Sequence, residues 1–423
     1  MPEKIYKIGI LHYSAPPVVG GVENVIHAHV HLFVEAGHPT TVLAGRGEKD
    51  ALPRGAEFIH IPELDSEHPE ILKINQELEQ GRVPMNFDAM VDRLTQSLLP
   101  RFETLDVIIV HNIFTKHFNL PLTAALFRLL DQRAIPHYIA WCHDFSWTSP
   151  RSRLKVFPNY PWDLLRTYRT DVTYVTVSQK RQGELSALYG CPVEMIRAVY
   201  NGVDPKESFA LSDVGLALIK RLNLWDSDLN LLMPVRVTHA KNFELALHVA
   251  AALKAEGVHP KFVVTGPPDP HDPMSIKYFE DLLALRKQLG VEQELRFVYE
   301  SGPDAPEPFV IDMPVVADLF RVSDALFLPS HREGFGMPIL EAGLVGIPVF
   351  CADTIPAAQE IAEQDIVMFS PEALPDQVAE LILQTMEASP VHRLRRRVRQ
   401  SLSWDHIFQR EILPLLEQVH LEV

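Results

Sequence analysis

The sequence predicts an α/β protein made of two doubly wound domains, each built on a parallel sheet. The chain has 423 residues, which is too long for one ordinary hydrophobic core and suggests two domains of about 200 residues. Short apolar runs alternate with helical patterns, an order typical of a parallel sheet with helical crossovers. The alternation stops at a turn-rich segment near residue 200 and then starts again.

The first domain opens on Tyr6–His12, which reads as a buried parallel strand because it alternates little and is rich in β-branched residues. A loop containing Gly20-Gly21 follows, and apolar periodicity then predicts a helix from about Val22 to Ala36. Helical patterns such as Gln179–Tyr189 separate the later strands. These strands are predicted at Thr41–Leu43, Val107–Val110, Tyr138–Trp141 and Val172–Val177.

The segment Val199–Pro205 separates the two halves, and its Asn-Gly and Asp-Pro pairs mark turns. We place a hinge there, with one domain at residues 1–200 and the other at 201–403. The second domain interleaves strands with helices such as Phe243–Glu256 and Met274–Leu289. Its strands are predicted at Leu231–Met233, Phe262–Thr265, Arg296–Val298, Ala325–Leu328 and Val349–Cys351.

The composition is that of an ordinary soluble globular protein, and the charge argues against one class of partner, nucleic acids. Hydrophobic residues make up 47% of the chain and charged residues 22%. The net charge of −16 argues against broad nucleic-acid binding, because contact with phosphates needs a positive field. Cys142, Cys191 and Cys351 are dispersed and not at metal-ligand spacing, which favours free thiols in a reducing cytoplasm.

Membrane insertion is not expected. No apolar run approaches the roughly 20 residues that span a bilayer, and the first residues hold no apolar signal core. We therefore expect a cytoplasmic protein without a transmembrane segment. One basic run, Arg393–Arg399, falls on a predicted helix. A solvated helix face explains it, and docking on a membrane or another anion is the alternative, so peripheral membrane contact stays open.

The segment Glu333–Glu341 (Glu-Gly-Phe-Gly-Met-Pro-Ile-Leu-Glu) carries the strongest chemical signal. It follows the predicted strand Ala325–Leu328 and runs into a helix in which Pro338 suits the first position. Gly334 and Gly336 let the backbone approach a ligand and present free N–H groups to it. Amides suit anionic oxygens and carboxylates suit hydroxyl groups, so the segment indicates a nucleotide sugar.

Two cations, Arg236 and Lys241, follow the predicted strand Leu231–Met233, and a helix begins near Asn242. Ligands of open α/β sheets bind beyond the carboxyl ends of the strands. Two cations beside a helix N-terminus make a pyrophosphate site without a metal. Surface solvation is the plain alternative for lone cations.

The string Glu333–Ala342, followed by Gly346–Val349, resembles the donor-binding motif of the large retaining glycosyltransferase family 4. The resemblance extends over nearly the whole chain. Further matches are Gly-Gly-x-Glu from Gly20, Asn-Gly-Val-Asp from Asn201, and Arg-x4-Lys from Arg236. The resemblance implies the GT-B fold, in which two Rossmann-like domains face a central cleft. It also implies that residues 404–423, with an amphipathic stretch at Trp404–Val419, pack back on the N-terminal, acceptor-side domain.

The resemblance also implies roles on the donor side. Glu333 would touch the donor sugar, Glu341 the ribose hydroxyls, and Arg236 and Lys241 the diphosphate, with the base near Tyr299. The donor-binding candidates are Gly21, Arg236, Lys241, Tyr299, Glu333, Gly334, Phe335, Gly336, Met337 and Glu341. The catalytic candidates are His143, Glu333, Arg236 and Lys241.

His143 is a catalytic candidate because Trp141–Trp147 resembles the family segment whose histidine faces the donor sugar. His111 is a second candidate. Just beyond, Arg151–Lys155 holds three cations, which favours a small anionic acceptor because guanidinium forks match carboxylates and phosphates. Stacking of Trp147 on a neutral glycoside and a solvated loop are the alternatives. The acceptor-side candidates are His111, Asp144, Trp147, Arg151 and Arg153.

These features predict transfer of a hexose, glucose or mannose, from a UDP- or GDP-linked sugar to a hydroxyl acceptor. The resemblance implies retention of configuration and a front-face mechanism. A nucleotide-sugar epimerase of the same fold and a catalytically silent nucleotide-sugar-binding protein stay open as alternatives. A phosphorylase resembling this fold would need a lysine for pyridoxal phosphate, and the sequence holds no matching segment.

No cofactor and no metal are expected. Asp226-Ser-Asp228 matches a metal motif of a different glycosyltransferase fold, but it precedes its strand and reads as a turn at the wrong end of the sheet. His27, His29 and His31 do not form one site on a helix, because residues two apart do not share a face.

Overall fold

The structure is a computed structural model that describes residues 4–134, 137–269, 273–303 and 307–418. Contacts between residues divide the chain into two compact units. The N-terminal unit consists of Met1–Gly202 together with Trp404–Val423, and the C-terminal unit of Val203–Ser403. Each unit has a hydrophobic core of its own.

The described part of the N-terminal unit holds a seven-stranded parallel sheet in the order β3-β2-β1-β4-β5-β6-β7. The interior strand β1 is buried along its whole length, as expected where helices cover both faces of a parallel sheet. Ile8 lies beside Thr40 of β2 and Val107 of β4. The strands are β1 (Ile8–Ser14), β2 (Thr40–Arg46), β3 (Glu57–His60), β4 (Val107–His111), β5 (His137–Cys142), β6 (Val172–Thr176) and β7 (Ile196–Ala198).

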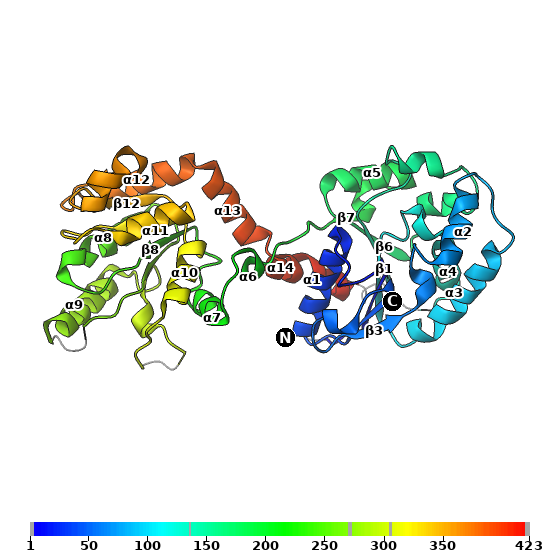
Figure 1. The fold of residues 1–423 in the computed structure, drawn as a ribbon, viewed down its shortest axis with the longest axis horizontal. Helices are drawn as coiled ribbons and strands as arrows, with labels where there is room; N and C mark the ends of the chain where they lie inside the picture. Colours follow the sequence, from blue (N-terminus) through cyan, green and yellow to red (C-terminus); the bar gives the residue numbers. More distant parts are fainter. Residues whose placement is uncertain (1–3, 135–136, 270–272, 304–306, 419–423) are drawn as a thin grey trace. The chain divides into compact units, whose positions relative to one another are not determined.

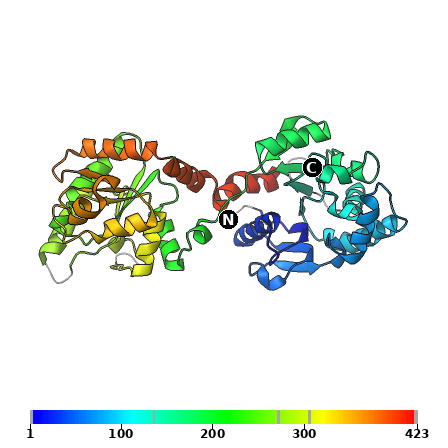
Figure 2. The ribbon, with the colours of Figure 1, turned by 45° about the horizontal axis from the view of Figure 1, so that its top comes forward.

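Helices lie on both sides of this sheet, with α1 on one side and α3 and α4 packed together on the other (Figures 1 and 2). Ser178 caps the start of α5, and Gly190, at a φ of +65°, ends that helix in the left-handed conformation that favours glycine. The helices are α1 (Gly21–Glu35), α2 (Pro69–Leu78), α3 (Phe87–Phe102), α4 (Leu120–Asp131) and α5 (Gln179–Tyr189).

The last helical segment also packs on the N-terminal unit. It comprises α14 (Trp404–Ile407), a π-helical stretch at Phe408–Ile412 and α15 (Leu413–Gln418). The Trp404 ring meets His29 of α1 edge to face with centroids 5.5 Å apart, and Phe408 meets Phe33 at 5.6 Å. Residues 419–423, which belong to the predicted segment 404–423, lie outside the described part of the chain.

The C-terminal unit contains, in its described residues, a six-stranded parallel sheet in the order β10-β9-β8-β11-β12-β13. Leu231 of β8 pairs with Phe262 of β9 and Ala325 of β11. The strands are β8 (Leu229–Met233), β9 (Pro260–Val264), β10 (Leu295–Phe297), β11 (Ala325–Leu328), β12 (Val349–Ala352) and β13 (Val367–Phe369).

Helices form two layers around this second sheet. Helix α8 packs against α9 and α12, whereas α10 packs against α7 and α11 (Figure 1). The helices are α6 (Pro205–Ser208), α7 (Asp213–Leu222), α8 (Phe243–Ala255), α9 (Pro273–Leu289), α10 (Met313–Val322), α11 (Met337–Val345), α12 (Pro375–Ala388) and α13 (Pro390–Ser401). Across the described ranges, no helix is long and apolar enough to cross a membrane.

The predicted fold class, two Rossmann-like doubly wound parallel-sheet domains, is confirmed. The strand order changes direction between β1 and β4 in one unit and between β8 and β11 in the other. In open α/β sheets, ligands bind beyond the carboxyl ends of the strands at such switch points. These two switch points are therefore the expected places for a functional site.

Candidate functional site

Lys241 and Glu333 form an ion pair at the switch point of the C-terminal unit. Lys241 Nζ lies 2.6 Å from Glu333 Oε2, and the two side chains are only 17% and 12% exposed. Lys241 ends a 3-10 turn after β8, and Glu333 lies in the loop after the neighbouring strand β11. The fold thus brings together two residues that belong to different predicted motifs.

The loop after β11 holds the Glu333 carboxylate in place. Ser330 Oγ donates a hydrogen bond to Glu333 Oε1 at 2.9 Å. Thr354, which follows β12, donates to the Ser330 carbonyl at 2.9 Å and so ties the loop to the next strand. The Arg332 N–H donates to the Ala240 carbonyl at 3.4 Å, which joins the loop to the turn that carries Lys241. The carboxylate is therefore oriented before any ligand arrives.

Gly336 is where this loop turns into α11. Its φ is +104°, a conformation that favours glycine, and a Cβ there would lie 2.6 Å from Ile355 Cγ2. The helix begins at Met337, one residue before the predicted start at Pro338, which takes the second position. Phe335 is 39% exposed and Met337 55% exposed. Both candidate side chains are therefore accessible beside the loop.

Three further donor candidates, Arg236, Glu341 and Gly334, are at least partly accessible to solvent. Arg236 is exposed, and Glu341 is half-buried in α11. In the part of the chain that the structure describes, no hydrogen bond or ion pair engages either side chain. A Cβ on Gly334 would meet nothing within 4 Å, so the loop backbone also faces open space.

Two residues shape the neighbouring loops. Gly266 begins the Pro-rich segment 266–273, and a Cβ there would lie 2.6 Å from Arg236 Cα, so this loop packs directly on the Arg236 backbone. Positions 270–272 of that segment lie outside the described residues. Tyr299 lies in a 3-10 turn after β10, and its ring packs edge to face on Phe279 at 5.8 Å. Its carbonyl accepts the Phe309 N–H at 2.9 Å.

In the N-terminal unit, His111 and His143 meet at the carboxyl ends of the neighbouring strands β4 and β5. His111 Nδ1 lies 3.1 Å from His143 Nε2, and the rings stack with centroids 5.4 Å apart. Asn112 has a φ of +60°, and its Oδ1 accepts the His143 N–H at 2.8 Å and the Asp144 N–H at 3.2 Å. Asn112 therefore fixes the backbone that carries His143.

His12 and His29 complete a buried histidine cluster. His12 Nδ1 donates to the His111 carbonyl at 2.9 Å, and the His29 ring lies 5.4 Å from that of His111. Burial lowers the pKa of His12 to about 4 and the pKa values of His29 and His143 to about 3. Burial also holds the pKa of His111 well below its usual value. All four imidazoles are therefore neutral near pH 7.

The glycine pair before α1 has two different environments. Glu23 folds back toward β1, where Ser14 Oγ donates to Glu23 Oε1 at 2.5 Å. A Cβ on Gly20 would lie 2.1 Å from Glu23 Oε2, so this bond depends on the absence of a side chain. A Cβ on Gly21, by contrast, would meet nothing within 4 Å. Gly21 therefore presents an open N-terminal end of the helix.

Trp147 is already covered by cations. It is 9% exposed, and its Nε1 donates to the Trp162 carbonyl at 3.2 Å. The guanidinium groups of Arg153 and Arg166 lie 4.7 Å and 4.5 Å from its ring centroid. This arrangement leaves little ring surface on which a sugar would stack.

The other acceptor candidates divide into paired and open groups. Asp144 pairs with Arg181 at 3.0 Å. Arg151 is exposed at the start of a 3-10 turn, and over the described ranges its side chain makes no hydrogen bond or ion pair. Arg151 is therefore available to an anion, whereas Arg153 also packs on Trp147.

The Asp226–Asp228 motif and the histidines of α1 were not expected to bind a metal, and the structure shows where they lie. Asp228 pairs with Arg396 and accepts the His259 N–H at 2.9 Å, at the amino end of β8. His29 is buried whereas His31 is exposed, as expected for residues on different helix faces. Among the residues that the structure describes, no group of three His, Cys, Asp or Glu side chains is arranged to hold a metal ion.

Sequence reasoning missed several residues that position these groups. Ser330 comes two residues after the end of β11, and Asn112 comes directly after β4, so a polar residue just past a strand was the available signal. Asparagine also tolerates the left-handed conformation better than most residues. For His12 and His29 there was no local signal, because their partners are distant in the chain.

The chain matches the models of two glycosyltransferase families. Residues 19–207 match the family described as Glycosyltransferase Family 4. Residues 218–401 match the family described as Glycosyl transferases group 1. The first match lies almost wholly in the N-terminal unit, and the second lies in the C-terminal unit.

Individual relatives are more distant. A mannosylglucosylglycerate synthase of Petrotoga mobilis is 26% identical over 265 residues, 58% of this chain and 59% of that protein. A D-inositol 3-phosphate glycosyltransferase of Jonesia denitrificans is 27% identical over 242 residues, 55% and 54% of the two chains. The chain thus spans little more than half the length of these relatives. A structure of Anabaena HepE with UDP-glucose aligns over 98% of both chains, with 17% identity and a TM-score of 0.34.

Proposed function

Because this chain belongs to the family 4 and group 1 glycosyltransferases over residues 19–207 and 218–401, we propose that it transfers a hexose from a nucleoside-diphosphate sugar to a hydroxyl acceptor. The observation that carries this proposal is the Lys241–Glu333 pair at the switch point of the C-terminal sheet. A cation for a diphosphate and an oriented carboxylate for sugar hydroxyls are the two groups that such a donor requires.

In the proposed reaction the bond between the anomeric carbon and the diphosphate oxygen breaks, and its electron pair leaves with the diphosphate. Lys241, Arg236 and the N–H groups of Gly334 and Gly336 stabilise this charge as it develops. The acceptor oxygen bonds to the anomeric carbon on the same face, and its proton passes to the departing phosphate oxygen. Configuration is then retained without a protein nucleophile.

Glu333 and Glu341 would bind the hydroxyl groups of the donor. Ser330 and Lys241 each engage one oxygen of Glu333, and a carboxylate has further lone pairs that accept hydrogen bonds from the donor sugar. Glu341, whose carboxylate is unpaired in the described residues, would accept from the ribose. The donor base, uracil or guanine, would lie near Tyr299.

We further propose that the reaction needs no metal and no cofactor. Lys241 and Arg236 supply two cationic donors at one edge of the sheet; Glu333 offsets the charge of Lys241, and the N-terminus of the following helix α8 adds positive potential for the diphosphate. The Glu333 carboxylate is paired with Lys241 and Ser330, and the Glu341 carboxylate has no second carboxylate beside it in its motif. They therefore do not form the cluster of oxygen ligands that Mg²⁺ prefers.

The acceptor is proposed to be a small anionic molecule, such as a sugar acid or a phosphorylated polyol. Arg151, exposed and unpaired within the described residues, supports this because a guanidinium matches carboxylate and phosphate oxygens. The relatives' names include glycerate, a carboxylate, and inositol 3-phosphate, a phosphate ester.

An acceptor-dependent release assay tests the function. The chain is incubated with UDP-, GDP- and ADP-linked glucose and mannose, with and without a panel of sugar acids and polyol phosphates. We expect nucleoside diphosphate release that one acceptor accelerates, and a product with the same anomeric configuration as the donor sugar. Isomerised sugar nucleotide without acceptor would indicate an epimerase instead. Donor binding without release under any condition would indicate a silent binding protein.

A further inference from the structure

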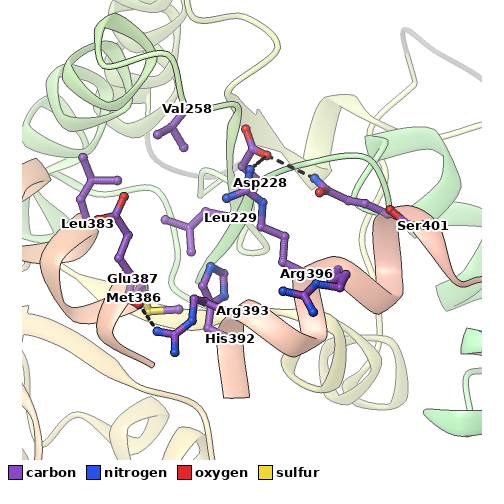
Figure 3. A pocket seen from close by; sticks show the side chains of 12 residues that line it. Asp228, Leu229, Val258, Leu383, Met386, Glu387, His392, Arg393, Arg396 and Ser401 are labelled. Carbon is purple, nitrogen blue, oxygen red and sulfur yellow. Dashed lines mark hydrogen bonds and ion pairs between the residues drawn. The ribbon is translucent and has the colours of Figure 1, made fainter. Parts of the chain in front are cut away.

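A cavity of about 380 Å³ lies beside α13 in the C-terminal unit. Asp228 and Leu229, at the start of β8, and Val258, just before β9, form part of its wall (Figure 3). It therefore lies at the amino edge of the sheet. Lys241 and Glu333 follow the carboxyl ends of β8 and β11, so the cavity is separate from the proposed donor site.

One face of α13 is structural. Arg395 and Arg399 turn to Asp324, just before β11: Arg399 Nη1 lies 2.9 Å from Asp324 Oδ2, and Arg395 Nε lies 3.7 Å from Oδ1. Burial alone would raise the pKa of Asp324, but His392 and these arginines outweigh it and hold that pKa below its usual value. The expectation of a solvated face is therefore wrong for Arg395 and Arg399, which anchor the helix.

The other face of α13 lines the cavity with Arg393 and Arg396 (Figure 3). Arg397 also lines the cavity. Arg393 lies three residues before Arg396 and four before Arg397, so it shares a helix face with each of them, whereas the adjacent Arg396 and Arg397 diverge. Arg396 pairs with Asp228, and Arg393 donates to the Glu387 carbonyl oxygen. Arg397 is exposed, and within the described ranges its side chain has no hydrogen bond or ion pair.

We propose that this cavity is a second ligand site, which binds a phosphate-bearing anion. Three guanidinium groups line it with two carboxylates, those of Asp228 and Glu387, and Arg396 already pairs with Asp228. The local balance is thus positive in a chain with a net charge of −16. Arg393 and Arg397, one helical turn apart, present forked donors that match phosphate oxygens. The volume suits a small ligand.

The phosphate has two possible sources, a small soluble compound and a lipid headgroup. The cavity is large enough for the first. For the second, Val391 and Leu394 of the same helix are 74% and 60% exposed and would suit insertion beside a headgroup. The chemistry of recognition is the same, so the experiment has one arm for each source.

Calorimetric titration with pyrophosphate tests the small soluble compound as the source. The proposed donor site also binds a diphosphate, so all measurements use a background chain, the full chain in which Arg236→Ala and Lys241→Ala disable that site. Adding Arg393→Gln and Arg397→Gln should weaken pyrophosphate binding at least about tenfold, because two charge-assisted contacts are lost. Arg397→Gln alone should also weaken it, and that side chain has no partner in the described residues whose loss would unfold the helix.

The matched control is Arg410→Gln, at an exposed arginine of a helical segment in the N-terminal unit, which should leave the affinity unchanged. In the lipid arm, the same background chain is floated with phosphatidylcholine vesicles with and without phosphatidic acid. Binding only to vesicles, lost in the Arg393 and Arg397 variant, assigns the headgroup as the source. The proposal is overturned if neither probe binds the background chain, or if the added substitutions change neither interaction.

Discussion

Lys241 and Glu333 lie 2.6 Å apart at the ends of the neighbouring strands β8 and β11, and each is more than four-fifths buried. Each charge would be costly alone in so covered a place, because a largely buried unpaired charge loses its hydration without compensation. The pair therefore keeps both side chains in position at the sheet edge. It is the feature from which the proposed chemistry follows.

We predict that Glu333→Gln, Lys241→Ala and Arg236→Ala each lower turnover at least about tenfold, which is roughly 1.4 kcal/mol of lost transition-state stabilisation. The first removes the oriented carboxylate, and the others remove charge from the leaving group. Steady-state kinetics with the best donor measure this. Near-normal turnover in all three variants would place the site elsewhere.

A double variant and a control sharpen that test. If Lys241 and Glu333 act on one step, the double variant should lose less than the product of the two single losses. The control is Lys206→Ala, which breaks an exposed ion pair of 2.8 Å with Asp213 in the same unit. It should leave turnover unchanged.

Gly336→Ala should destabilise the C-terminal unit by about 1–3 kcal/mol, because the residue has a positive φ and no room for a Cβ beside Ile355. Gly343→Ala is the matched control. It lies inside α11 with nothing within 4 Å of the added atom, and should stabilise by up to about 1 kcal/mol. Urea unfolding of both variants tests this, and equal stabilities would refute the steric argument.

Acid should destabilise the N-terminal unit. In the unfolded chain the histidines take up protons below about pH 6.5, whereas folded His12, His29 and His143 do so only at about pH 3 to 4. Protons therefore favour the unfolded state. Stability is complete above pH 6.5 and falls by about 1.4 kcal/mol per histidine and pH unit as the pH drops toward 4.

His29→Leu isolates one member of this group. Both ring nitrogens of His29 are buried without a hydrogen-bond partner in the described structure, so leucine should flatten the pH dependence. His31→Leu, on the exposed face of the same helix, should not. Tryptophan fluorescence during urea unfolding at pH 5, 6 and 7.5 is a suitable readout, because four of the five tryptophans lie in this unit. An unchanged slope in His29→Leu would contradict the assignment.

Activity should persist in full after incubation with EDTA. Lys241 and Arg236 already provide the positive charge for the diphosphate, so chelation removes nothing that the proposed reaction uses. The measurement is turnover before and after chelation, followed by addition of magnesium or manganese. Loss of activity in EDTA that either metal restores would reject the metal-free mechanism.

Arg151→Ala should raise the KM for the best anionic acceptor, while hydrolysis of the donor without acceptor stays unchanged. Arg153→Ala should do the same and should also lower stability by about 0.5–1 kcal/mol, because its guanidinium covers the Trp147 ring. Acceptor kinetics and thermal unfolding separate the two effects. An unchanged KM in both variants would end the anionic-acceptor proposal and leave the donor site untouched.

The fold was largely predictable because buried parallel strands are short, apolar and β-branched. The strands that sequence reasoning missed are β3, β7 and β13, which lie at sheet edges and are three or four residues long with partly exposed side chains. An edge strand has one pairing partner and a less buried surface, so its residues need not be uniformly apolar. The pattern that identifies central strands is therefore weak there.

The candidate site was predictable only in part. Glu333 and Lys241 each stand in a local motif, but their ion pair depends on β8 and β11 being neighbours, which no local pattern encodes. The covering of the Trp147 ring also depends on packing between separate segments, because the Arg166 guanidinium contacts the ring from a later turn. The position of a residue just after a strand could thus be predicted from the sequence. Buried contacts between segments that are distant in the chain could not.

The most direct test of the central claim is a thermal-shift panel with UDP-, GDP- and ADP-sugars on the wild-type chain and on Arg236→Ala and Lys241→Ala. A ligand at 100 times its Kd stabilises a protein by about 2.7 kcal/mol. The account predicts that one nucleotide sugar raises the Tm of the wild type and that both variants lose most of this shift. The account would be contradicted by a panel without any shift, or by a shift that survives intact in both variants.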